Sequence, residues 1–140
     1  MTDERPHDVA VLSFLCDCQG RIASVLGDVL LNRPLESTVW WLRARETADR
    51  LLGESLADRV PPSTRRETLI DRAYARTGLL QYDQALADWN EIMQADGDVI
   101  DFEVGVGKAT TLFRMSRFDE ALEVARRTAE AQEHPAIIYA

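Results

Sequence analysis

The sequence predicts an all-α protein in which antiparallel helix pairs stack as a short solenoid behind an N-terminal helical cap. Two observations predict this fold class. Beyond residue 63, apolar residues recur at the three- and four-residue spacing of a helix face. In addition, residues 81–89 read QYDQALADW, and thirty-six residues later the chain reads RFDEALEVA. A chain of 140 residues is long enough to bury a core within one compact unit.

The net charge of the chain bears on which classes of partner it can bind. The formal net charge is −8 and the arginines form no extended basic patch, so we expect no nucleic acid ligand. An acidic surface instead suits a basic protein or peptide. Every basic residue except Lys108 is an arginine, which is typical of a GC-rich bacterial genome.

The N-terminal residues indicate a cytoplasmic protein. They read MTDERPHD, which is too charged for a secretory signal, and no apolar run approaches the roughly 20 residues of a membrane span. We therefore expect no membrane partner. In the cytoplasm Cys16 and Cys18 would remain reduced thiols.

The first thirty residues allow two interpretations. As helices, they carry one apolar stripe before and one after Cys-Gln-Gly at residues 18–20. As strands, VAVLSFLC and RIASVLGD flank the turn DCQG, and this form resembles the opening hairpin of a PAS-type sensor domain. We expect helices, because the spacing of the second stripe fits a 3.6-residue period. The alternative is an α+β fold with an N-terminal β-hairpin.

The segment from residue 34 to residue 62 completes the cap. RPLEST resembles a helix entrance, and TVWWLRARETADRLLGESLADRV reads as one helix or as two that are broken near Gly53. Pro61 and Pro62 then stop the helix. We place the boundary of the N-terminal segment, 1–62, at this pair of prolines and expect it to form one compact unit with residues 63–140.

Four helices are expected after the prolines. They cover residues 64–77, 82–94, 101–114 and 118–132, with the turn signal ADGD after the second helix and Pro135 after the last. A shift of thirty-six residues aligns Ala73 with Ala109, the aromatic Tyr82 with Phe118, and Ala85 with Ala121.

This alignment resembles the tetratricopeptide repeat (TPR), a helix-turn-helix unit of about 34 residues. Small residues lie where its paired helices approach, and an aromatic residue fills the space between neighbouring repeats. The resemblance implies two repeats, 66–99 and 102–135. The chain departs from the family pattern at several positions: Arg76 and Leu112 replace the large aromatic of the first helix, and Gly105 and Gly107 weaken the second copy of that helix.

Catalytic and metal-binding patterns are missing from the sequence. His7 and His134 lie near opposite ends, and neither belongs to a nucleophile, zinc or phosphate-binding motif. The spacing Cys-x-Cys is too short for a zinc half-site. We therefore expect no enzyme activity, no catalytic residue, no metal and no cofactor.

The resemblance implies a binding function. In the family, the first helices of successive repeats line a concave face that holds a peptide. The matching positions in this chain are Glu67, Ile70, Asp71, Tyr74, Val106, Thr110, Phe113 and Arg114. We expect a non-enzymatic adaptor or chaperone-like module for an apolar or basic peptide or protein. The alternative is a regulatory or sensory domain that carries the PAS-like hairpin.

A second surface is expected at the adjacent tryptophans. Neighbouring residues on a helix point about 100° apart, so Trp40 and Trp41 cannot both be fully buried against one neighbour. One of them is expected to contact a partner or a second subunit. Ile137 and Ile138 are a further candidate for a homodimer contact.

Overall fold

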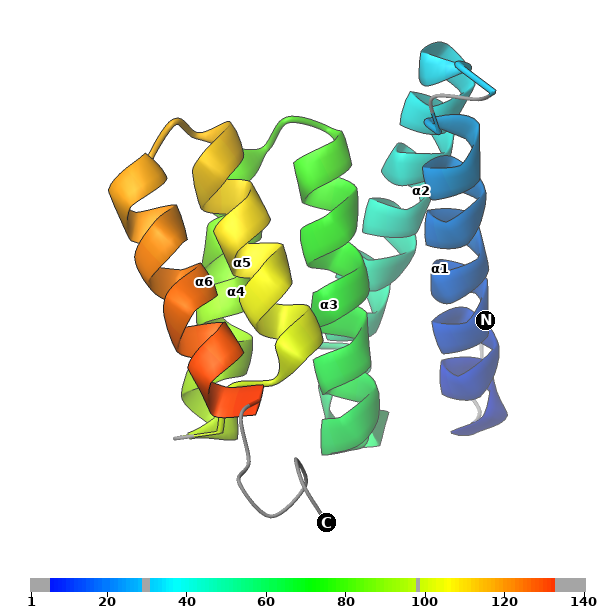
Figure 1. The fold of residues 1–140 in the computed structure, drawn as a ribbon. Coiled ribbons are helices and arrows are strands. Elements are labelled where there is room, and N and C mark those ends of the chain that lie inside the picture. The colour runs from blue at the N-terminus through cyan, green and yellow to red at the C-terminus, as the bar shows by residue number, and fades with distance from the viewer. Residues whose placement is uncertain (1–5, 29–30, 98, 133–140) are drawn as a thin grey trace, which may run out of the picture. The chain divides into compact units, whose positions relative to one another are not determined.

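The fold is all-α in the computed structural model, which describes residues 6–28, 31–97 and 99–132 (Figure 1). The predicted fold class is thereby confirmed, and these residues contain no strand. The helices are α1 (Pro6–Leu26), α2 (Pro34–Leu52), a 3₁₀ turn (Ala57–Arg59), α3 (Pro62–Gly78), α4 (Tyr82–Asp96), α5 (Phe102–Arg114) and α6 (Phe118–Gln132).

The chain divides into two compact units, Met1–Gln81 and Tyr82–Ala140. The sequence suggested a boundary at Pro61 and Pro62, whereas the division falls between α3 and α4. In the first unit α1, α2 and α3 pack together. In the second unit α5 packs against both α4 and α6.

Local chemistry sets the helix boundaries. Pro34 and Pro62 open α2 and α3 at the first helical turn, where a missing backbone N–H costs nothing. Asp101 caps α5 by accepting a hydrogen bond from the backbone N–H of Val104 at 3.2 Å. The expected break near Gly53 is the end of α2, which stops at Leu52.

The similarity at a thirty-six-residue interval is also present in the backbone conformation. Leu80 follows α3 with φ 63°, and Ser116, thirty-six residues later, follows α5 with φ 61°. After each helix the next residue closes the turn: the N–H of Gln81 donates to the carbonyl of Arg76 at 2.7 Å, and that of Arg117 to the carbonyl of Leu112 at 2.9 Å. Both helices therefore end in the same left-handed cap.

The N-terminal segment differs from its expected form. Residues 6–26 are one continuous helix, so both the break at Cys-Gln-Gly and the β-hairpin alternative are wrong. The reason is an apolar stripe that faces α2 and continues on both sides of Gly20. Its members are Val9, Leu12, Cys16, Ala23 and Leu26. Their spacing of three, four or seven residues keeps them on one helix face.

Polar side chains tie α1 to α2. The thiol of Cys16 donates to the carbonyl of Ala44 at 3.4 Å, and the hydroxyl of Ser37 donates to the carbonyl of Ala23 at 2.6 Å. Cys16 belongs to the core cluster of the first unit. Burial, reinforced by nearby carboxylates, raises the pKa of this thiol to about 12.

Each unit also contains a close approach between a tryptophan and a helical glycine. In the first unit the indole of Trp41 on α2 lies where a side chain at Gly78 would have to be. In the second unit the indole of Trp89 on α4 occupies the same kind of space beside Gly107, and Thr128 on α6 does so beside Gly105. From the sequence, Gly105 and Gly107 were predicted to lower the stability of this helix, but both glycines are needed for packing.

Substitution of these glycines tests the packing. We expect Gly107→Ala to lower the free energy of unfolding by about 1–3 kcal/mol, because the new methyl group overlaps the Trp89 indole. Gly20→Ala is the matched control in α1, where the nearest side-chain atom is 3.7 Å away. That variant should gain up to about 1 kcal/mol from helix propensity. Urea denaturation measures the free energy of unfolding of both variants. Equal effects of the two substitutions would contradict the close contact between Gly107 and Trp89.

Candidate binding site

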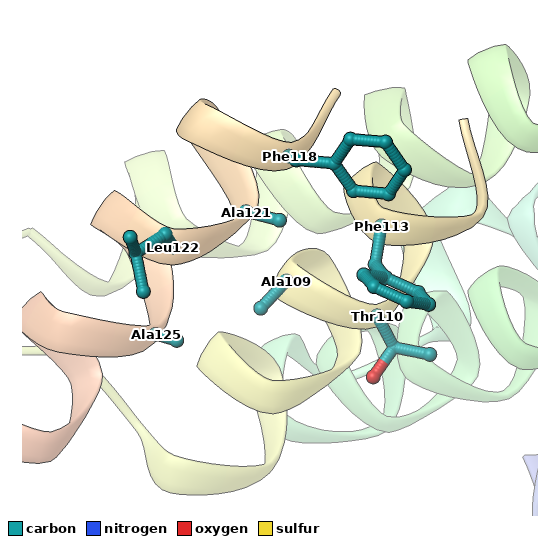
Figure 2. A pocket seen from close by; sticks show the side chains of 7 residues that line it. All are labelled: Ala109, Thr110, Phe113, Phe118, Ala121, Leu122 and Ala125. Atoms are coloured by element: carbon teal, nitrogen blue, oxygen red, sulfur yellow. The ribbon is translucent and has the colours of Figure 1, made fainter. Parts of the chain in front are cut away.

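The second unit contains an open apolar pocket between α5 and α6 (Figure 2). Its volume is about 520 Å³. The lining residues are Ala109, Thr110, Phe113, Phe118, Ala121, Leu122 and Ala125. The hydroxyl of Thr110 is the only polar side-chain group among these seven.

Helical periodicity places these side chains on one side of each helix. Ala109, Thr110 and Phe113 follow one another on α5 at positions i, i+1 and i+4. On α6 the lining residues start at Phe118 and continue at the third, fourth and seventh positions after it. Figure 2 shows alanines from both helices in the centre of the pocket and bulkier side chains around them. The small residues make the hollow, and the large ones form its walls.

Two phenylalanines form one end of the pocket. The rings of Phe113 and Phe118 meet edge to face, with 5.3 Å between their centroids and 66° between their planes. This geometry is favourable for aromatic pairs and holds both rings in place. Despite this contact, Phe113 is 62% exposed and Phe118 is 55% exposed, and Leu122 on the opposite wall is 70% exposed. Such a group of large exposed apolar side chains indicates an interaction site.

A rigid layer supports the pocket from behind. Thr111 is buried on the opposite side of α5 from Phe113, and its hydroxyl accepts a hydrogen bond from the indole N–H of Trp89 at 3.0 Å. The same hydroxyl lies 2.9 Å from the carbonyl oxygen of Gly107 and donates to it. The bond from Trp89 joins α4 to α5, and the bond to Gly107 lies within α5 and orients the Thr111 hydroxyl toward the indole. Phe113 and Thr110 are thereby directed outward.

Several charged side chains on and just before α6 form ion pairs. The Arg117 guanidinium bonds to Glu120, and Arg126 bonds to Glu123 and Glu130. The bond from Arg117 lowers the pKa of Glu120, and that from Arg126 lowers the pKa of Glu123. These ion pairs are exposed, so they contribute little stability. None of these charged side chains lines the pocket, whose distinguishing chemistry is apolar contact.

The structure places the predicted contact residues in two groups. On α5, Thr110 and Phe113 line the pocket, and Val106 and Arg114 are also exposed. On α3, Glu67 and Tyr74 are exposed, Asp71 is half-buried, and Ile70 is only 8% exposed. Ile70 therefore offers little surface to a ligand. The first group and the second belong to different units.

Sequence reasoning missed the half of the pocket that α6 contributes. Phe118 and Ala121 were interpreted as packing residues between repeats, and Leu122 was not considered as a contact. A signal for them was present. The spacing of Phe118, Ala121, Leu122 and Ala125 places them on one side of a helix, and this pattern is visible in the sequence.

The other predicted surface was expected at Trp40, Trp41, Ile137 and Ile138. Trp41 packs between Gly20 and Gly78 inside the first unit. The ring of neighbouring Trp40 lies 4.6 Å from the guanidinium carbon of Arg43, in cation–π geometry. Ile137 and Ile138 lie outside the described residues. Within the part of the chain that the structure describes, no group of three or more metal-ligating side chains comes together.

Comparisons with known proteins assign no family to the chain: no family model, no curated protein and no solved structure matches it.

Thr111 and Thr110 provide a test of the supporting layer. We expect Thr111→Val to lower the free energy of unfolding by about 1–3 kcal/mol, because it removes the buried hydroxyl that Trp89 and Gly107 share. Thr110→Val is the control, since its side chain is exposed on the pocket side of the same helix. That variant should change the stability by less than about 0.5 kcal/mol. Chemical denaturation followed by tryptophan fluorescence measures both variants.

Proposed function

We propose that this protein is a non-enzymatic interaction module, an adaptor or chaperone-like binder, that holds an apolar helical segment of a protein partner in the α5–α6 pocket. The observation that carries this proposal is the exposure of Phe113, Phe118 and Leu122 around a floor of alanines. Exposed aromatic anchors beside a hollow are typical of residues that dominate binding energy at protein interfaces.

The shape and chemistry of the pocket favour a helix over a small metabolite. A metabolite site normally combines an apolar cavity with several converging polar groups. Here the wall residues are apolar apart from Thr110, and the pocket is open along two helices. Amphipathic helices bind such grooves through apolar side chains at positions i, i+3, i+4 and i+7. The two helix walls would accept such a stripe between them.

The repeat interpretation leads to the same ligand. The left-handed caps at Leu80 and Ser116 support a unit that is used twice at a thirty-six-residue interval. In the tetratricopeptide family that the sequence resembles, the aromatic residue at the position of Phe118 packs against the following unit. We infer that a helix of the partner occupies the corresponding place on α5 and α6.

The α3 surface is a second part of the proposal. Tyr74 is 38% exposed, and Glu67 and Asp71 lie on the same helix. An apolar side chain with a basic neighbour would suit this combination of an aromatic ring and two carboxylates. A cytoplasmic location remains a prediction from the sequence.

The available apolar surface implies moderate affinity. Fully burying a Phe or Leu side chain contributes about 1.5–3 kcal/mol, and the three anchors are each more than half exposed. Covering them would contribute roughly 3–6 kcal/mol before the cost of association is subtracted. With further contacts from the rim, we expect a Kd in the micromolar range.

A displayed library of random 16-residue peptides tests the site. We expect selected peptides to carry apolar residues at helical spacing, and to bind in fluorescence anisotropy with a micromolar Kd. Phe113→Asp and Leu122→Asp should each weaken that binding by at least tenfold, because they put a carboxylate against the apolar ligand. Tyr74→Ala shows whether the α3 surface also contributes.

Leu35→Asp is the matched control, because Leu35 is 83% exposed on α2 in the other unit. It should leave the affinity unchanged. Circular dichroism establishes that every variant remains folded. Equal binding by the wild type and both pocket variants, or the selection of peptides without any apolar pattern, would sink the proposal.

A further inference from the structure

The side of α1 that faces away from α2 carries another apolar stripe, distinct from the buried one. Its members are Val11, Leu15, Cys18, Ile22 and Val25, and Phe14 lies beside them. The aliphatic members are between 39% and 60% exposed, and Phe14 is 72% exposed. Successive residues turn by about 100°, so Cys18 points roughly 160° away from the buried Cys16. The stripe therefore faces away from the core of its unit.

The spacing of this stripe indicates what would cover it. Intervals of four, three, four and three residues are those of the a and d positions of a coiled coil. A second helix whose apolar residues have the same spacing would pack against this stripe. It extends over two heptads, or about 21 Å of helix.

We propose that α1 pairs antiparallel with α1 of a second copy of this chain, about a two-fold axis close to Cys18. The stripe fits itself in this arrangement, because Val11 and Val25 lie seven residues on either side of Cys18. Each copy then places its Val11 beside Val25 of the other copy. An isologous contact of this kind closes on itself and produces a dimer, not a filament.

The charges beside the stripe favour the antiparallel direction. Asp17 and Arg21 lie together on one flank, where their side chains form a 2.8 Å ion pair. The other flank faces α2, where Gln19 accepts a hydrogen bond from Thr47. In an antiparallel pair the two charged flanks adjoin, so Arg21 of each copy comes near Asp17 of the other. A parallel pair would put each charged flank beside the α2 side of its neighbour.

A membrane is the other class of occupant for such a helix. By length and composition the window Val9–Leu26 could cross a bilayer, and only 22% of it is buried. However, Asp17 and Arg21 sit in the middle of that window. Surface-binding helices instead rely on several basic residues, whereas this chain has a net charge of −8. Charge and heptad spacing together favour a second copy.

The contact is small, so we expect a dimer with a micromolar Kd. Two heptads would bury less than the roughly 1,600 Å² of a standard interface. In sedimentation equilibrium at about 100 µM the wild type should be mainly dimeric. Val11→Glu and Val25→Glu should each raise the Kd at least a hundredfold. Leu122→Glu, in the α5–α6 pocket, should leave it unchanged, so this test is independent of the proposed peptide site.

Cysteine chemistry tests the position of the axis. Mild oxidation with diamide should join two chains through Cys18, and Cys16→Ser should not affect this bond. Cys16 is buried, and its pKa of about 12 keeps it a thiol. In a Cys18→Ser background, Val11→Cys protein mixed with Val25→Cys protein should cross-link. Neither protein should cross-link alone, whereas a parallel pair would reverse that result.

The proposal is overturned if the wild type remains monomeric at about 100 µM, or if Val11→Cys protein cross-links with itself. It is also overturned if the monomer floats with phosphatidylcholine vesicles and Val25→Glu abolishes that flotation, because the stripe would then bind lipid.

Discussion

In each unit, an indole ring fills the space that a helical glycine leaves empty. Trp41 lies against Gly78 in the first unit, and Trp89 lies against Gly107 in the second. Because any side chain at these glycines would overlap the ring, each contact brings its two helices closer together than another residue would allow. In the second unit the bond from Trp89 to Thr111 adds direction to this packing. The outward face of α5 is a consequence of these inner contacts.

The α5–α6 pocket and the outward stripe of α1 have the same origin. A helix pair in a stacked array has apolar residues on more than one side, because each pair packs against its neighbours. Phe118 and Leu122 on α6, and Val11 and Ile22 on α1, are exposed although their helices are well packed elsewhere. Exposed surfaces of this kind favour association with other helices. Their different chemistry, a hollow in one case and a heptad seam in the other, suits different occupants.

Particular residues show how far the site could be predicted. Thr110 and Phe113 were expected at a binding surface, and both line the pocket. Phe118 was assigned to packing, because its sequence position is equivalent to that of Tyr82. Sequence equivalence does not convey whether a further helix covers a residue. Ile70 shows the reverse case, since the resemblance implied a contact position and the side chain is only 8% exposed.

The sequence by itself determined the all-α class and the helices from Pro62 onward, because 3.6-residue periodicity, prolines and turn residues act locally. The thirty-six-residue interval was also local information, and it reappears in the caps at Leu80 and Ser116. Tertiary structure decided which of the two apolar stripes of α1 is buried, since both have helical spacing. It also decided the role of Gly105 and Gly107. Whether a glycine weakens a helix or admits a neighbouring side chain depends on residues distant in the chain.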